Sequence, residues 1–194
     1  MYDFLARQYF RSRPNLEVPQ RKLAVFFLAT TGAGKSTLTE EIVRQLHATY
    51  LSNDEVRGLL ASRDSGVHPK EVINRTWELI RKESANQFIV FDSSIIAVHA
   101  DPHSYFNMAG VNGYESFLIA INIPAATLSE RIIRRKRSDM DDDLKNLAYR
   151  YDLHQKVMTE LCPDILISDM SASSVDQVIE ALGRKMLQDP RMSA

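Results

Sequence analysis

The stretch ATTGAGKST, at residues 29–37, follows directly on the apolar run LAVFFL at residues 23–28. The apolar run has the composition of a buried strand, and the residues after Lys35 carry apolar side chains at helical spacing. In such a strand, turn and helix, the backbone N–H groups of the turn point into a concavity that holds phosphate oxygens. Gly32 and Gly34 let the backbone approach the anion closely, because glycine has no Cβ atom. The stretch therefore predicts a phosphate-binding loop, or P-loop.

The side chains of this loop indicate its ligand. Lys35 places an ammonium group against the terminal phosphates of a nucleoside triphosphate, and the Ser36 hydroxyl is a hard oxygen ligand for Mg²⁺. We therefore expect a nucleoside triphosphate to bind together with Mg²⁺. The expected nucleotide-binding residues of the loop are Thr31, Gly32, Ala33, Gly34, Lys35, Ser36 and Thr37.

Ala29 departs from the strict P-loop pattern, which has its first glycine five residues before Gly34. The looser form of the pattern admits alanine, because the residue lies at the exit of the strand and a single methyl group can fit. A left-handed backbone at an alanine would cost roughly 1 kcal/mol or more. Either the loop avoids that conformation at Ala29, or its affinity for phosphate is reduced.

The chain as a whole has the length and composition of one ordinary domain. It has 194 residues and a formal net charge of −1, so nothing global indicates nucleic acid or an anionic membrane as a general partner. Cys162 is the only cysteine, which precludes an internal disulfide and suits a reducing compartment. The N-terminus has no signal pattern, and no apolar run is long enough to span a bilayer. We expect a cytoplasmic protein without a membrane partner, while the oligomeric state does not follow from the sequence.

Apolar, strand-like runs alternate with amphipathic helical segments along the chain. The expected strands are residues 23–28, 49–51, 88–91, 117–123 and 164–168. Because this alternation is typical of a parallel sheet covered on both faces, we expect a three-layer α/β fold with five parallel strands. In such a fold, ligands bind beyond the carboxyl ends of the strands.

The sequence divides into a short N-terminal part and one domain. Residues 1–21 are expected to form an amphipathic helix and a linker, packed on a domain formed by residues 22–194. The aromatic side chains among arginines in residues 2–11 would also suit a nucleic-acid surface. Late in the chain, a polar loop is expected at residues 138–143, before a helix at residues 144–161.

Two carboxylates that follow predicted strands are candidates for the chemistry. Asp92 ends an apolar strand beside the P-loop, which is the geometry of a residue that orients Mg²⁺ and its waters. A residue that only caps the following loop is the alternative. Asp54 follows the second strand, at the start of a helix with a capping box formed by Ser52 and Glu55. Asp54 either faces the γ-phosphate or is a first-turn carboxylate favoured by the helix dipole.

The P-loop together with the segment LSNDEVR, at residues 51–57, resembles a group of small AAA-type ATP-binding P-loop kinases. The group comprises the polynucleotide kinases, zeta toxins and chloramphenicol phosphotransferases. The resemblance implies ATP as the nucleotide; the Asn-Lys-x-Asp segment that reads guanine in GTPases is absent from the sequence. It also implies that Asp54 takes the proton from the acceptor hydroxyl and that Arg57 holds an anionic part of the acceptor.

Three features late in the chain resemble the lid of nucleoside monophosphate kinases: ERIIRR at residues 130–135, the pair Asp142-Asp143, and Arg150. The lid would comprise about residues 134–145. The resemblance implies arginines that close over ATP, and helical spacing places Arg131, Arg134 and Arg135 on one face. We assign Arg131 to nucleotide binding and Arg135 to catalysis at the transferred phosphate. A solvated basic face paired with nearby acids is the alternative.

The two resemblances cover most of residues 22–170 and imply an ATP- and Mg²⁺-dependent phosphotransferase. It would transfer the γ-phosphate to a hydroxyl of a small molecule, a nucleotide or a polynucleotide end. Its catalytic residues would be Lys35, Asp54 and Arg135. Related kinases often carry a basic, acceptor-binding residue soon after the strand-end acid, whereas SSIIAV at residues 93–98 is uncharged. The acceptor is therefore not identified. A non-catalytic, nucleotide-responsive regulator is the alternative function.

Overall fold

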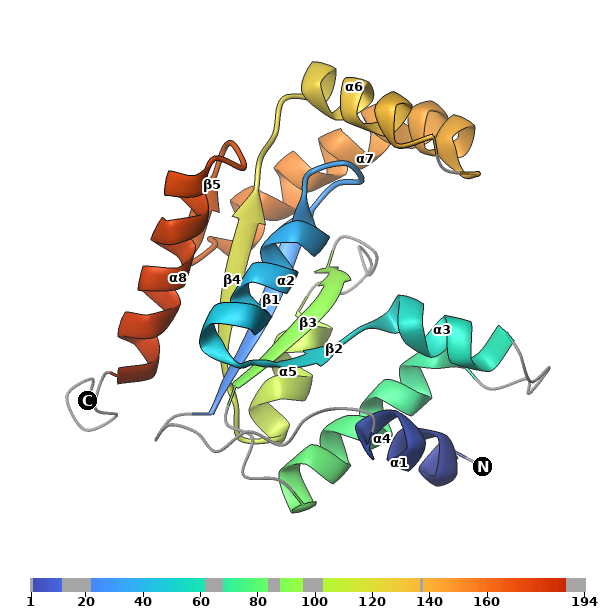
Figure 1. The fold of residues 1–194 in the computed structure, drawn as a ribbon, viewed down its shortest axis with the longest axis vertical. Coiled ribbons are helices and arrows are strands. Elements are labelled where there is room, and N and C mark those ends of the chain that lie inside the picture. Colours follow the sequence, from blue (N-terminus) through green and yellow to red (C-terminus); the bar gives the residue numbers. More distant parts are fainter. Residues whose placement is uncertain are drawn as a thin grey trace.

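The computed structural model describes residues 2–11, 22–61, 68–83, 88–95, 103–136 and 138–187. Helices and strands alternate along most of the chain (Figure 1). In chain order, the elements are α1 (Tyr2–Arg11), β1 (Leu23–Ala29), α2 (Lys35–Leu46), β2 (Thr49–Leu51), α3 (Asn53–Ala61), α4 (Pro69–Glu83), β3 (Phe88–Ser94), α5 (Ser104–Val111), β4 (Glu115–Ile121), α6 (Ala125–Arg135), α7 (Met140–Leu161), β5 (Ile165–Ile167) and α8 (Ala172–Leu187).

The strands form one parallel sheet in the order β2-β3-β1-β4-β5. β1 is the central strand and every one of its residues is buried, as its uninterrupted apolar run predicts. The predicted three-layer α/β fold with five parallel strands is confirmed. The P-loop therefore leaves the carboxyl end of the central strand.

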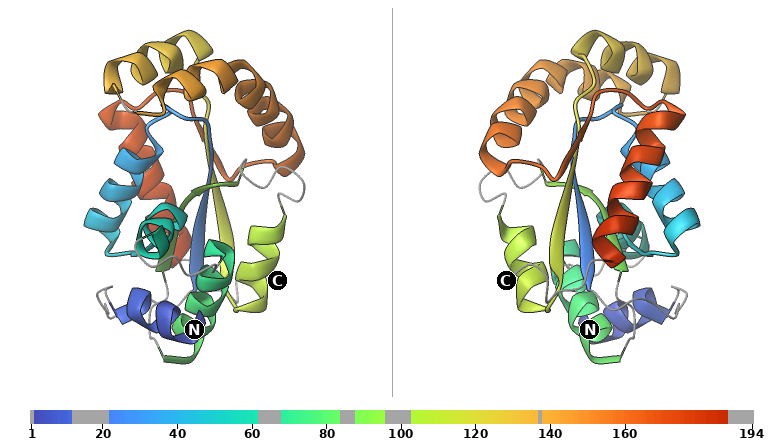
Figure 2. Two further views of the ribbon diagram at one scale, coloured as in Figure 1. Left: turned by 90° about the vertical axis from the view of Figure 1, so that its right-hand side faces the viewer. Right: turned by 90° about the vertical axis from the view of Figure 1, so that its left-hand side faces the viewer.

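The side chains of β1 alternate between two hydrophobic clusters, one on each face of the sheet. The even-numbered residues 24, 26 and 28 pack with side chains of α1, α3, α4, α5 and α7. The odd-numbered residues 23 to 29 pack with side chains of α2, α6, α7 and α8. Figure 2 shows the sheet nearly edge-on, with α2 and α8 on one face and α5 on the other.

The structure corrects several predicted boundaries. β3 continues to Ser94 instead of ending at residue 91, so Asp92 lies within this strand, and β4 ends at Ile121 instead of residue 123. β4 begins two residues earlier than expected, because the Glu115 N–H donates to the Lys22 carbonyl at 2.8 Å and extends the pairing with β1. The loop expected at residues 138–143 is wrong for its last four residues, since α7 already begins at Met140. The Asp143 N–H donates to the Asp139 carbonyl at 2.9 Å. The acidic side chains in this first turn are favoured by the helix dipole.

The N-terminal helix α1 packs against α4 (Figure 1). Its Leu5 and Ala6 are buried in the same cluster as the core of α3 and α4. The division of the chain into residues 1–21 and 22–194 stays a prediction, because residues 12–21 lie outside the described ones. Within the described ranges, no helix combines the length and the apolar character that crossing a membrane requires.

Candidate nucleotide-binding site

Two glycines set the shape of the loop between β1 and α2. Gly32 has a φ of 85° and Gly34 a φ of 99°, a region that residues with side chains rarely adopt. Both glycines also lie close to the surrounding chain. A Cβ atom at Gly34 would lie 2.8 Å from Met170 Cγ, and one at Gly32 would lie 3.3 Å from the Leu128 carbonyl oxygen. The positive φ values favour glycine at both positions, and the close contacts leave little room for a side chain.

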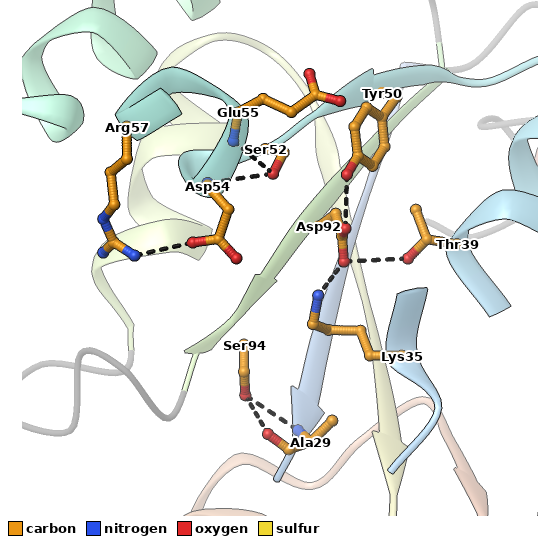
Figure 3. A network of polar contacts seen from close by, with 10 residues as sticks. All are labelled: Ala29, Lys35, Thr39, Tyr50, Ser52, Asp54, Glu55, Arg57, Asp92 and Ser94. Carbon is orange, nitrogen blue, oxygen red and sulfur yellow. Dashed lines mark hydrogen bonds and ion pairs between the residues drawn. The ribbon is translucent and has the colours of Figure 1, made fainter. Parts of the chain in front are cut away.

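Ala29, at the position of the missing first glycine, is the last residue of β1. Among the described residues, positive φ values outside glycine occur only at His47, Lys136 and Cys162. The Ala29 N–H donates to Ser94 Oγ at 3.1 Å, and the Ser94 hydroxyl donates to the Ala29 carbonyl at 2.7 Å (Figure 3). Ser94 thus joins β3 to β1 beyond the point where their register shifts. The loop therefore avoids the left-handed conformation at Ala29, which is the first of the two alternatives considered for this residue.

Lys35 and Asp92 lie side by side at the carboxyl edge of the sheet (Figure 3). Lys35 Nζ forms an ion pair with Asp92 Oδ1, and Thr39 Oγ1 lies 3.4 Å from the same oxygen. The Tyr50 hydroxyl donates to Asp92 Oδ2 at 2.7 Å. Asp92 is only 7% exposed, and a nearly buried carboxylate is tolerated because cationic and hydroxyl partners replace water. The structure therefore brings together the predicted phosphate-binding lysine and the predicted magnesium-binding carboxylate, while Ser36 is exposed beside them.

A cavity of about 210 Å³ opens beside the P-loop. It is lined by Gly32, Gly34, Thr37, Arg131, Arg134, Arg135 and Met170. Arg131 Nη1 donates to the carbonyl oxygens of Gly32 and Ala33, at 3.4 Å and 3.3 Å. Guanidinium groups gathered at a concave site attract and pair with phosphate oxygens. The cavity thus brings the predicted nucleotide-binding Arg131 and the predicted catalytic Arg135 to the loop.

Arg150, on α7, also contacts the P-loop; the lid resemblance includes this arginine, but it is not among the predicted site residues. Arg150 Nη1 donates to Thr31 Oγ1 at 3.1 Å and to Asp143 Oδ1 at 2.6 Å. Asp143 and Arg150 are seven residues apart, which places them on one face of a helix two turns apart. This spacing indicates in the sequence that the two residues share a face of the helix. Only the fold shows that this face of α7 is turned to the P-loop.

Asp54 and Arg57 lie on α3 and pair with each other. Arg57 Nη1 donates to Asp54 Oδ1 at 2.9 Å, and the two side chains are 62% and 82% exposed, respectively. Ser52 caps α3 as predicted, because its hydroxyl accepts the N–H groups of Asp54 and Glu55. Figure 3 shows the Asp54 carboxylate turned toward Arg57 and apart from the Lys35–Asp92 pair. The fold therefore places the two predicted acceptor-side residues together, on a separate element from the phosphate-binding residues.

His154 links α7 to the end of β1 beneath the P-loop. It is 1% exposed, and its Nε2 lies 3.3 Å from the Leu28 carbonyl oxygen. Burial lowers the pKa of His154, against hydrogen bonds to the backbone of Leu28 and Ile121 that raise it. The net lowering favours a neutral imidazole, which can donate Nε2–H to the carbonyl.

A family model described as "AAA domain" matches residues 30–153. Comparison with curated protein sequences gives no match. The matched residues run from Thr30, at the P-loop, into α7 and include every site residue predicted from the sequence.

Several solved structures share the fold. The tunicamycin resistance protein of Deinococcus radiodurans has a TM-score of 0.58 at 17% identity, covering 87% of this chain and 98% of the other. The APS kinase of Mycobacterium tuberculosis, in complex with AMPPNP and APS, has a TM-score of 0.55 at 18% identity, covering 85% and 99%. The shikimate kinase of Acinetobacter baumannii, in complex with shikimate, has a TM-score of 0.52 at 13% identity, covering 88% and 97%. The resemblance to small P-loop kinases is confirmed at the level of the fold.

Proposed function

Because the chain belongs to the AAA domain family and has the fold of small P-loop kinases, we propose that it is an ATP- and Mg²⁺-dependent phosphotransferase. It would transfer the γ-phosphate of ATP to a hydroxyl of a small molecule, a nucleotide or a polynucleotide end. The proposal rests on one observation: two glycines of the P-loop and three arginines line one cavity, and the same loop leads into Lys35, which pairs with Asp92. Such an arrangement suits charge neutralisation of a transferring phosphoryl group.

The residues at the loop fit a magnesium nucleotide. The two glycines give the loop its positive φ angles, and the exposed Ser36 hydroxyl and the Asp92 carboxylate are hard oxygen donors of the kind Mg²⁺ prefers. Ser36 and Asp92 would hold the ion directly or through its waters, and bound Mg²⁺ would neutralise charge on the β- and γ-phosphates. Lys35 and the loop N–H groups would bind the phosphates. Arg131 would bind the nucleotide, and Arg135 would stabilise charge on the transferred group.

The acceptor side of the reaction is assigned to α3. The acceptor oxygen would bond to the γ-phosphorus as the bond between that phosphorus and the β,γ-bridging oxygen breaks, leaving ADP. The acceptor's proton would pass to Asp54, whose exposed carboxylate is open to an incoming hydroxyl. Arg57 would hold an anionic group of the acceptor after leaving its ion pair with Asp54. A cytoplasmic location is part of the proposal, since the single, exposed cysteine suits a reducing compartment.

The test is transfer of radiolabelled γ-phosphate to a panel of nucleosides, oligonucleotides, sugars and antibiotics, by wild type and by Asp54→Asn. The variant should bind ATP normally and lose little stability, because an exposed ion pair contributes at most about 1 kcal/mol. Its transfer rate should fall by about 10²–10⁴-fold, the usual effect of losing a general base. Glu55→Gln, at the next residue of the same helix, is the matched control and should transfer at the wild-type rate.

Two outcomes would contradict the proposal in different ways. An Asp54→Asn variant that transfers phosphate as fast as wild type would leave Asp54 as a helix-start carboxylate without a role as base. A wild-type protein that binds ATP but phosphorylates no acceptor in the panel, and does not hydrolyse ATP, would indicate a nucleotide-responsive regulator.

A further inference from the structure

The two carboxylate oxygens of Asp92 have different kinds of partner. Oδ2 accepts a hydrogen bond from the Tyr50 hydroxyl at 2.7 Å, whereas Oδ1 faces the ammonium group of Lys35 and the more distant Thr39 hydroxyl (Figure 3). One oxygen is thus held by a hydroxyl donor on a neighbouring strand. The other oxygen is held by the Lys35 ammonium group, which binds the phosphates in the proposed function.

The sheet explains why Tyr50 reaches Asp92. Tyr50 on β2 pairs with Val90 on β3, so the two residues are level in the parallel sheet. Side chains two residues apart on a strand point to the same face, so Asp92 lies on the face of Val90, one diagonal step from Tyr50. An aromatic side chain is long enough to span such a diagonal. The contact therefore joins two neighbouring strands whose positions the fold determines.

We propose that Tyr50 is a positioning residue, which holds Oδ2 of Asp92 so that Oδ1 can pass from Lys35 to magnesium. The inference rests on the proposed function. When Lys35 turns to the phosphates, a carboxylate that is 7% exposed loses its cation. An unpaired buried charge is strongly unfavourable, so a second cation must replace the lysine. With Oδ2 fixed by Tyr50, the carboxylate presents Oδ1 to that cation without having to be reoriented.

The consequence is a coupling between nucleotide and metal that depends on the Tyr50 hydroxyl. Coupling between two ligands is reciprocal, so magnesium should raise nucleotide affinity by the factor by which nucleotide raises magnesium affinity. Without the hydroxyl, the Asp92 carboxylate can rotate and either oxygen can retain Lys35. Removal of a residue that orients a metal ligand typically weakens metal binding by about 10–100-fold. The hydroxyl should matter little when magnesium is absent.

The experiment is calorimetric titration with the non-hydrolysable analogue AMPPNP, with and without Mg²⁺, on wild type and Tyr50→Phe. The enhancement of AMPPNP affinity by Mg²⁺ should be about tenfold smaller in Tyr50→Phe, with little change in the metal-free affinity. Tyr2→Phe, on the exposed side of α1, is the matched control and should behave as wild type. If Mg²⁺ enhanced AMPPNP affinity in Tyr50→Phe as much as in wild type, the inference would be overturned. It would also be overturned if Tyr50→Phe lost AMPPNP affinity equally with and without Mg²⁺, because Tyr50 would then stabilise the loop as a whole.

A double-mutant cycle with Asp92→Asn tests whether Tyr50 acts through Asp92. Asp92→Asn alone should reduce the enhancement by Mg²⁺, and adding Tyr50→Phe should reduce it no further. A further reduction would overturn the inference, because Tyr50 would then act elsewhere. Thermal unfolding of each variant without ligand verifies that it is folded. If Mg²⁺ fails to enhance AMPPNP binding even in wild type, the magnesium site of the proposed function is wrong; this outcome is distinct from a defect seen only in the variants.

Discussion

Ala29→Gly restores the strict P-loop pattern, and the structure predicts that it lowers the free energy of unfolding. Ala29 is 3% exposed and lies in the central strand. Both of its backbone polar groups are bonded to the Ser94 hydroxyl, and its backbone is not left-handed. The substitution therefore relieves no strain. It removes a buried methyl group and makes the unfolded chain more flexible.

The magnitude follows from these two effects. Losing one buried methyl group costs about 0.8 kcal/mol of transfer free energy. Glycine within a strand costs roughly a further 0.5–1 kcal/mol relative to alanine, because it loses more backbone entropy on folding. The free energy of unfolding should fall by about 1–2 kcal/mol, and nucleotide affinity should not rise. Urea unfolding and AMPPNP titration measure the two quantities.

Ala24→Gly is the matched control for this prediction. Ala24 is a second alanine of β1, fully buried and far from the loop, so its loss should lower stability by a similar amount. A difference in the loss of unfolding free energy between the two variants would measure the effect that is specific to Ala29, at the entry to the loop. If Ala29→Gly were more stable than wild type, or bound AMPPNP more tightly, Ala29 would be strained in the wild-type loop, contrary to its unstrained backbone in the structure.

Two further predictions concern the phosphate site and the buried histidine. Lys35→Ala should abolish or severely weaken thermal stabilisation by ATP, because the loop loses its ammonium group; unchanged ATP affinity in calorimetry would place the nucleotide elsewhere. The lowered pKa of His154 means that the unfolded chain binds a proton near pH 6.5 while the folded chain does not. Unfolding free energy should therefore decrease as pH falls below about 6.5. Urea titrations across this pH range measure the effect. In His154→Gln, the unfolding free energy should decrease less as the pH falls, whereas the control His47→Gln, at an exposed position, should behave as wild type. The same pH dependence in both variants would contradict the assignment of the effect to His154.

The sequence by itself determined the phosphate-binding loop and the class of fold. Both rest on short patterns: an apolar run long enough for a buried strand, glycines that permit unusual backbone angles, and a lysine at the start of a helix. The capping of α3 by Ser52 was also predictable, because a cap and its N–H groups are at most three residues apart. The start of α7 at Met140 does not follow from the sequence, since acidic residues occur both in polar loops and in the first turn of helices.

Only the tertiary structure decided which side chains meet at the site. Ala29 and Ser94 are 65 residues apart, Tyr50 and Asp92 are 42 apart, and Thr31 and Arg150 are 119 apart. The physical reason is the strand order. β3 lies between β2 and β1, so its side chains reach a tyrosine on one neighbour and a loop entry on the other. Hydrophobic periodicity predicts that a strand forms and which faces it buries, but no local pattern states which strands become its neighbours.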